Sequence, residues 1–394
     1  MTATFHRRPL PDAQTALASE RGRALFAEAL AAGTMAGYFA VAEQFQTQAE
    51  PAYCGLTSLA VVLNSLAVDP QRVWKGPWRW FSEELLDCCV PLPTVRERGI
   101  TFDELACLGR CNGAIARTWR ASEHDVATLR AHVIDAATDP QAPRVIAAYA
   151  RSALGQTGGG HFSPVAGYHA ATDLALVLDV ARFKYPPHWV SIAALHAAML
   201  PPDPTTARSR GWITVVRAAR PISVLLELRC DRVRWSDIGA ALAAGRAALE
   251  ALPVDATLDV RARAWLGAAA HLGDAIALRA LDDDDARDRQ DQVLAVLRQG
   301  VAAEVARAAL TALDRRPPEP ALATLLLLLA PADLPAAEAL RALRADLPEP
   351  VACELAALDE QLAEVAAMAA APAPTCGASS SPRADASLTP AARR

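Results

Sequence analysis

The sequence predicts an α+β protein in which a mixed amino-terminal domain is followed by a mostly helical domain. Nearly all aromatic residues and most glycines precede residue 220, whereas alanine, leucine, arginine and aspartate dominate after it. Before that boundary, segments of helical periodicity come first and β-rich segments follow. Near the end, proline, alanine, serine and threonine lack apolar periodicity, which indicates disorder. The expected units are residues 1–220, a helical domain over 221–370, and a disordered tail over 371–394.

Five segments define the amino-terminal domain. Apolar residues recur at helical spacing over residues 22–32 and 56–66. Residues 161–168 and 174–180 predict two strands joined by a turn at 169–173. A further β-rich segment covers residues 213–216. These elements predict helices packed on a sheet.

The second domain is expected to be a set of helices. Ser236 is expected to cap the first one, which runs to about Leu252. An acidic run, Asp282–Asp285, precedes another helix, where negative charge suits the positive end of the helix dipole. Further helices are expected over 258–281, 321–329, 335–343 and 351–369.

Composition and charge exclude two classes of partner and predict the cellular compartment. The formal charge of −5 provides no basic footprint, so nucleic acid is not an expected partner. No apolar run reaches the roughly 20 residues that span a bilayer, so no membrane association is expected. Eight cysteines without a secretory signal predict reduced thiols and a cytoplasmic protein. An amino-terminal transit peptide is the open alternative, although Asp12 and Glu20 come early for one.

Cys54 has the setting of a nucleophile. Apolar residues at helical spacing begin at Leu56, and Pro51 stands just before them, which places Cys54 at the start of a helix. Helix N–H groups and the helix dipole there favour a thiolate. Gln48 lies six positions earlier, the spacing by which papain-like proteases pair an oxyanion-hole amide with their cysteine. A small buried core cysteine remains the alternative interpretation of this segment.

His161 and Asp179 complete a candidate triad. His161 follows three glycines at the start of a predicted strand, where Gly160 allows a substrate backbone to approach closely. Asp179 is the single acid in the next, strongly apolar strand, nearly opposite His161 across one hairpin. A buried acid needs a partner, and a histidine there would be oriented by it. A purely structural Asp–His hydrogen bond is the alternative.

Residues 5–217 closely resemble the catalytic domain of phytochelatin synthases, the glutathione γ-glutamylcysteinyltransferases, whose fold is papain-like. The words that carry the resemblance are FQTQAEPAYCGL at 45–56, DP at 69–70, WKGPWRWF at 74–81, LDCC at 86–89, QTG at 156–158, GHFSP at 160–164 and LDVARFKYPPHW at 178–189. The family's triad falls on Cys54, His161 and Asp179, and its oxyanion glutamine on Gln48.

The resemblance implies a reaction. Cys54 would attack the Cys–Gly peptide carbonyl of glutathione and release glycine, and a second glutathione or a phytochelatin would accept the γ-glutamylcysteinyl unit. It implies no fixed cofactor; ions such as cadmium, zinc or copper would act as metal–glutathione thiolates, as part of the substrate. Partners would be glutathione, phytochelatins and heavy-metal ions, and a homodimer is open.

Substrate carboxylates require cations near the triad. Arg182 and Lys184 follow Asp179, and Arg210 precedes the next strand. The other expected substrate contacts are Gly160, Phe162 and Tyr185. Strand alternation would place Arg182 on the face opposite Asp179, and solvated or structural arginines are the alternative for Arg182 and Arg210.

Four cysteines form a weak candidate metal site: Cys88, Cys89, Cys107 and Cys111. Cys107 and Cys111 would share one helix face, and four thiols can bind Zn²⁺ or Cd²⁺. Burial as ordinary core residues is the favoured alternative. The aromatic residues Trp74, Trp78, Trp80 and Phe81 are expected to pack the domain.

Two other functions remain beside the transferase. Water could replace the acceptor amine, which would make the protein a glutathione hydrolase on the same triad. The chain could instead be a non-enzymatic, thiol-rich metal-binding protein. After residue 220 the chain has only Cys230, Cys353 and Cys376, with no adjacent pair, which favours helical scaffolding over metal sensing in the second domain.

Overall fold

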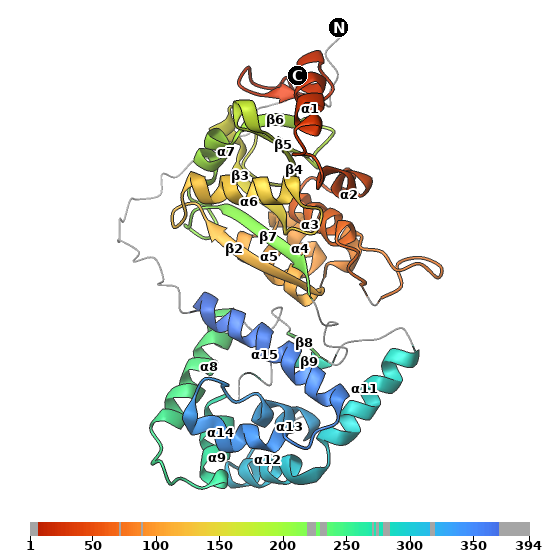
Figure 1. Cartoon of the computed structure of the whole chain (residues 1–394). Helices are drawn as coiled ribbons and strands as arrows, with labels where there is room; N and C mark the ends of the chain where they lie inside the picture. The colour runs from red at the N-terminus through yellow and green to blue at the C-terminus, as the bar shows by residue number, and fades with distance from the viewer. Residues whose placement is uncertain are drawn as a thin grey trace, which may run out of the picture.

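The computed structural model describes most of the chain (Figure 1). The described residues are 7–70, 72–87, 90–218, 226–228, 235–269, 272, 276–278, 284–315 and 320–369. The predicted tail over 371–394 lies outside them.

Among the described residues, a seven-stranded antiparallel sheet organises the amino-terminal part, in the order β1-β6-β5-β4-β3-β7-β2. The strands are β1 (Thr15–Ala16), β2 (Ala114–Arg120), β3 (Arg144–Ala150), β4 (Gly160–His169), β5 (Leu174–Val177), β6 (His188–Ser191) and β7 (Gly211–Arg217). The predicted hairpin is confirmed as β4 and β5, joined through a single 3-10 turn, η3 (Ala170–Thr172). The prediction of a strand to residue 180 is wrong at its end, because β5 stops at Val177.

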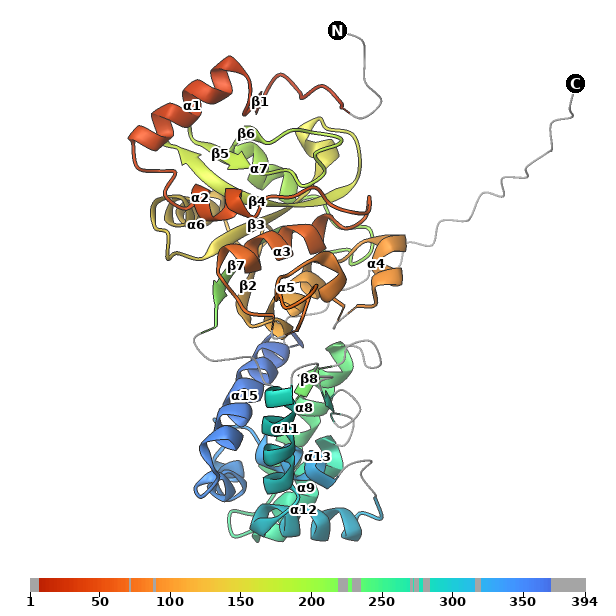
Figure 2. The same cartoon turned by 90° about the vertical axis from the view of Figure 1, so that its right-hand side faces the viewer.

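Helices cover both faces of this sheet (Figures 1 and 2). Along β3, Val145, Ala147 and Tyr149 pack with helices α6 and α7, whereas Ile146 and Ala148 pack with α3 and α5. This alternation is expected, because successive side chains of a β-strand point to opposite faces of the sheet. The helical elements are α1 (Glu20–Ala31), α2 (Tyr38–Glu43), α3 (Cys54–Ser65), η1 (Glu83–Leu85), α4 (Leu92–Arg98), α5 (Phe102–Cys111), α6 (Val126–Thr138), η2 (Arg151–Leu154) and α7 (Ile192–Met199). The two predicted helices correspond to α1 and α3.

The aromatic segment that follows α3 does not pack the domain as expected. Phe81 is fully buried, but Trp78 is 70% exposed, and Trp74 and Trp80 are exposed as well. A bridge between Lys75 and Trp78 folds this segment into a tight turn that projects from the surface. The apolar composition of the segment predicted burial, but among the described residues its three tryptophans are exposed.

The carboxy-terminal part is mostly helical and has its own hydrophobic core. A cluster within residues 238–362 surrounds Trp265, and its members come from every α-helix of this part. The elements are β8 (Leu226–Leu228), α8 (Trp235–Glu250), α9 (Leu258–Ala268), β9 (Ile276–Leu278), α11 (Asp284–Leu297), α12 (Gly300–Ala312), α13 (Pro320–Leu328), η5 (Pro335–Ala337), α14 (Glu338–Arg341), η6 (Ala342–Arg344) and α15 (Glu349–Ala369). The helix expected over 321–329 corresponds to α13, which is buried from Ala321 to Leu328.

Three predictions for this part need correction. Helix α8 already begins at Trp235, so Ser236 lies inside the helix and not at its cap. The helix expected over 258–281 ends at Ala268, and residues 276–278 pair with β8 instead. Helix α12 was not predicted, although its buried residues Ala302, Ala303, Ala306 and Ala309 recur at helical spacing. Within the described ranges, no helix is long and apolar enough to cross a bilayer.

Candidate active site

Cys54 is the first residue of α3, as the sequence predicts. The preceding residue, Tyr53, is the N-cap, and Thr57 N–H already donates to the Tyr53 carbonyl. Helix α3 can start so close to β4 because Gly55 has no side chain: a Cβ there would lie 3.4 Å from the Phe162 ring and 2.4 Å from Ile100. The helix therefore presents its positive amino-terminal end, with Cys54, beside the start of β4.

His161 and Asp179 meet as predicted. His161 Nε2 lies 2.9 Å from Asp179 Oδ1, and Asp179 is fully buried. Because the Nε2 atom is held by the carboxylate, the Nδ1 atom is the ring nitrogen left for the thiol. The imidazole and the Tyr149 ring form a T-shaped pair, with centroids 5.7 Å apart. The carboxylate also accepts a hydrogen bond from the Ala181 N–H at 2.9 Å.

The charges at this site favour a thiolate beside an imidazolium. Burial opposes ionisation of Cys54, but the charge of His161, a hydrogen bond from it and the Phe162 N–H together lower the pKa of the thiol. Burial alone would lower the pKa of His161, but the negative charges of Asp179 and Cys54 raise it above its ordinary value. A thiolate is the nucleophilic form of cysteine, so this pairing suits covalent catalysis.

Arg151 is a site residue that the sequence analysis missed. Its Nη2 atom donates to Asp179 Oδ1 at 2.9 Å, and its Nη1 atom lies 2.8 Å from Oδ2. The side chain is 4% exposed, and its Nη1 also donates to Gln156. Despite burial, His161 and Arg151 together hold the pKa of Asp179 well below its ordinary range. The sequence did offer one indication of this role: Arg151 directly follows the apolar strand β3. An arginine buried there needs a carboxylate or carbonyl groups as partners.

Gln48 lies in the loop that precedes Cys54, and its side chain faces that loop. Its side chain is buried, and its amide NH₂ donates to the carbonyls of Glu50 and Pro51, both at 2.8 Å. Its backbone N–H donates to Val180, beside Asp179, at 3.0 Å. The amide therefore stabilises the turn that leads to Cys54, and it would have to exchange one of these carbonyls to reach an oxyanion.

Two of the predicted cations flank the glycine run before His161. A Cβ at Gly158 would lie 2.9 Å from Lys184 Nζ, and one at Gly160 would lie 3.1 Å from Arg210 Nε and Nη2. Arg210 is buried and anchored by the Pro201 carbonyl at 2.9 Å and by Asp203 at 3.1 Å.

The other three predicted contacts lie in different surroundings. Arg182 is exposed over the Phe45 ring, 5.1 Å from its centroid, so the structure does not bring it to the triad. Tyr185 is buried, and its hydroxyl accepts from the Thr157 N–H at 2.8 Å. Phe162 is buried against the start of α3.

Comparison with known proteins identifies the family of this chain. A family model described as phytochelatin synthase matches residues 5–212, more than half of the chain. The chain belongs to the phytochelatin synthase family. It is similar to glutathione gamma-glutamylcysteinyltransferase 1 of Triticum aestivum, 49% identical over 237 residues, or 60% of this chain and 47% of that protein. It is also similar to glutathione gamma-glutamylcysteinyltransferase 1 of Arabidopsis thaliana, at 47% identity (60% and 49%), and to the Schizosaccharomyces pombe enzyme, at 41% (60% and 56%). The match spans about half the length of these relatives of the family.

The candidate metal cysteines are only partly described. Cys107 and Cys111 lie on one face of α5, as expected, and their sulfur atoms are 3.9 Å apart in the core. Cys107 is disulfide-bonded, contrary to the expectation of reduced thiols. Cys88 and Cys89 lie outside the described residues. Among the described residues, no group of three or more histidine, cysteine or acidic side chains is placed to hold a metal ion. A four-thiol site in this member of the family stays a prediction.

Proposed function

We propose that the protein is a phytochelatin synthase that transfers the γ-glutamylcysteinyl unit of glutathione to a second glutathione or to a phytochelatin. The observation that carries the proposal is the Cys54–His161–Asp179 arrangement at the start of α3. The names of the relatives give the reaction class, since they are glutathione gamma-glutamylcysteinyltransferases over the matched segment.

Acylation comes first in the proposed mechanism. The Cys54 thiolate attacks the carbonyl carbon of the Cys–Gly bond, and the C–N bond breaks as His161 gives its proton to the departing glycine amine. The product is a γ-glutamylcysteinyl thioester on Cys54. The Cys54 N–H at the positive end of α3 would stabilise the oxyanion, and Gln48 would join it after giving up one carbonyl.

Transfer follows in the second step. The α-amine of the acceptor attacks the thioester, the C–S bond breaks, and His161 takes the proton that the amine loses. A new amide bond forms and the Cys54 thiolate returns. Asp179 keeps the imidazole oriented and stabilises it in its charged form through both steps.

Substrate carboxylates have candidate partners close to His161. Lys184 and Arg210 lie beside the glycine run, next to Gly158 and Gly160, and the space beside Gly159 is open for a peptide backbone. We assign the substrate role to these two cations, together with Gly160 and Phe162, and leave Tyr185 as a support for the loop at Thr157. A heavy metal such as cadmium would enter as a metal–glutathione thiolate, as part of the substrate.

The proposal also includes a papain-like catalytic unit over residues 1–220 and a helical unit over 221–370. The separate hydrophobic clusters, one set within residues 25–215 and one within 238–362, support this division. A cytoplasmic location and a homodimer stay predictions from the sequence.

Product analysis tests the function. The purified protein is incubated with glutathione, with and without cadmium, beside Cys54→Ala and the control Cys353→Ala, which removes an exposed free cysteine of α15. The expected products are glycine and γ-Glu-Cys oligomers that end in glycine, from the parent and the control but not from Cys54→Ala. Glycine with γ-Glu-Cys alone would identify a hydrolase, and no product from any variant would reject catalysis.

A further inference from the structure

A series of buried amide hydrogen bonds extends from the triad to the amino-terminal segment. Arg151, which pairs with Asp179, also donates from Nη1 to Gln156 Oε1 at 2.5 Å. Gln156 Nε2 donates in turn to Gln14 Oε1 at 2.7 Å, and Gln14 Nε2 donates to the Leu154 carbonyl at 2.8 Å. Both glutamines and Arg151 are buried. These contacts link the carboxylate of the triad to the residue that directly precedes β1.

The groups at the two ends fix the orientation of both amides. A guanidinium can only donate, so the Gln156 atom that faces Arg151 must be the amide oxygen. A carbonyl can only accept, so the Gln14 atom that faces Leu154 must be the amide nitrogen. The two amides then meet as a donor and an acceptor, as observed. Turning either amide over would place like groups together at both of its ends, so each is held in one orientation.

His188 provides the remaining partner of Gln156. Its Nδ1 atom lies 2.9 Å from the Pro186 carbonyl, so Nδ1 carries the proton and Nε2 is an acceptor. This Nε2 atom lies 3.3 Å from Gln156 Nε2, which donates its second hydrogen to it. His188 is fully buried, and burial lowers the pKa of His188, which favours the neutral form that this contact needs. Every hydrogen-bonding group of the Gln156 side chain therefore has a partner.

The segment that carries Gln14 is also held by its backbone. The Arg8 N–H donates to the Lys184 carbonyl at 2.9 Å. The Leu17 N–H donates to the Pro187 carbonyl at 2.9 Å, and β1 pairs with β6 at one end of the sheet. A substitution at Gln14 can therefore remove the amide contacts while the backbone of the segment stays in place.

We propose that Gln14 is a positioning residue that acts on the triad through Gln156 and Arg151. This inference rests on the proposed transferase function. Without Gln14, the Gln156 amide loses an acceptor and is free to turn, and Arg151 loses the fixed oxygen that holds its second side. The Asp179 carboxylate then loses part of its support, and it is this carboxylate that orients His161. The amino-terminal segment thereby contributes to the rate of the reaction without contacting the substrate.

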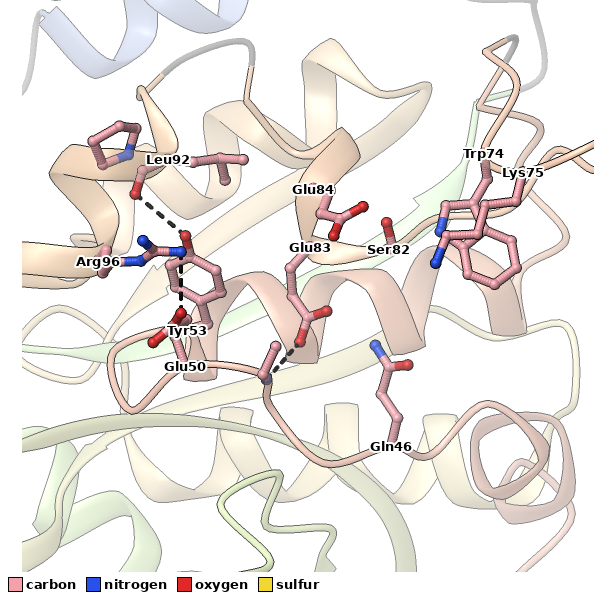
Figure 3. Close-up of a pocket in the computed structure, with 12 residues that line it drawn as sticks. Gln46, Glu50, Tyr53, Trp74, Lys75, Ser82, Glu83, Glu84, Leu92 and Arg96 are labelled. Carbon is pink, nitrogen blue, oxygen red and sulfur yellow. Dashed lines mark hydrogen bonds and ion pairs between the residues drawn. The ribbon is translucent and has the colours of Figure 1, made fainter.

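A separate cavity of about 410 Å³ lies beside Tyr53 (Figure 3). Its walls are the loop before α3, the exposed Trp74–Lys75 segment, η1 and the start of α4. Gln14 and Gln156 are not among its lining residues. A change in rate in a Gln14 variant therefore cannot come from an altered wall of this cavity.

Glycine release from glutathione tests the positioning role. In Gln14→Met, which keeps the length of the side chain, kcat should fall about tenfold, less than the roughly 100-fold that a displacement of about 1 Å can cost. KM for glutathione should stay within about twofold of the parent, because the side-chain hydrogen bonds of Gln14 go to Leu154 and Gln156. In a Gln156→Met background, the same change at Gln14 should alter kcat less than about twofold, because the connection is already broken.

Thr34→Val is the matched control for lost stability. Thr34 is also buried, and its hydroxyl lies within hydrogen-bond distance of the carbonyls of Ala29 and Tyr168. Its substitution should lower the midpoint of thermal unfolding, as Gln14→Met does, but should leave kcat unchanged.

Alkylation of Cys54 by iodoacetamide gives a measurement that needs no turnover. The midpoint of its pH profile, followed by mass spectrometry of the Cys54 peptide, should shift upward in Gln14→Met, because a displaced imidazolium stabilises the thiolate less. If Gln14→Met does not fold, Gln14→Glu, which keeps an acceptor for Gln156, should show the same shift by a smaller amount.

The possible results separate the positioning role from the function. An unchanged kcat and an unchanged alkylation midpoint in the folded variant would overturn the positioning role and leave the transferase intact. An equal loss of kcat in the Gln156→Met background would also overturn it, because independent effects add. Absence of glycine release from the parent would instead reject the function, and the alkylation midpoint would then decide whether Gln14 positions His161.

Discussion

Replacing Arg151 by methionine should destabilise the protein and slow its reaction. The guanidinium makes two contacts of 2.9 and 2.8 Å to the fully buried Asp179. Removing one partner of a buried ion pair costs about 3–5 kcal/mol, because the remaining charge is left without compensation. His161 and the Ala181 N–H still contact the carboxylate, so the lower end, about 3 kcal/mol at pH 7, is expected. Activity should fall about 100-fold, because a small displacement of Asp179 misplaces His161.

The pH dependence of the stability loss in Arg151→Met shows whether Asp179 is its cause. In the parent, the pKa of Asp179 is held well below its ordinary range, so its contribution to stability is present above about pH 4 and is lost as the pH falls further. Without Arg151 that pKa rises, because burial is less opposed. The stability difference between parent and variant should therefore be largest near pH 7 and should shrink as the pH is lowered towards 4.

Urea unfolding at several pH values measures this difference, with Arg144→Met as the matched control. Arg144 is equally buried but donates to the carbonyls of Pro140 and Ala142, so its loss should cost stability without this pH dependence. A cost below about 1 kcal/mol for Arg151→Met at pH 7, or a cost that grows on acidification, would refute the reasoning.

Three further predictions follow from the same contacts. Alkylation of Cys54 by iodoacetamide should remain fast at pH values below the ordinary cysteine pKa near 8.5. The midpoint of the pH profile of this rate should shift upward in His161→Ala. Equal pH profiles for parent and variant would contradict the lowering of the Cys54 pKa. Asp179→Asn should lower kcat about 10⁴-fold in a folded protein, and a loss below tenfold in stopped-assay rates would remove Asp179 from the triad. Gly55→Ala should cost about 1–3 kcal/mol in thermal unfolding, because its Cβ would meet an isoleucine carbon at 2.4 Å, whereas Gly159→Ala, with nothing within 4 Å, should be close to neutral; similar costs for both would contradict the packing.

The helix start at Cys54 and the contact between His161 and Asp179 could be predicted from the sequence because each residue has a strong local signal. The helix start at Cys54 follows from proline and apolar spacing, and Asp179 is conspicuous as the single acid in an apolar run. The meeting of His161 and Asp179 follows from one short turn, which brings nearby parts of the chain together. The resemblance to the family rests on the same residues.

The sequence-based predictions were wrong or incomplete where contacts between distant parts of the chain determine the structure. Arg151 could not be assigned, because its role depends on Asp179, 28 residues away on the far side of β4. The tryptophans near Trp78 resemble core residues by type, but the fold leaves them at the surface. The strand pairing of β9 with β8 joins segments about 50 residues apart and overrides the helical pattern between them.

The sequence by itself determined the division into a mixed and a helical part, the position of Cys54 at a helix start, and the hairpin that brings His161 and Asp179 together, because these depend on local spacing and short turns. Only the tertiary structure decided that Arg151 forms an ion pair with Asp179, that Lys184 and Arg210 lie beside the glycine run while Arg182 lies over Phe45, and that a cavity lies beside Tyr53. Those features depend on how distant segments pack and on which buried charges find partners, which residue spacing alone does not specify.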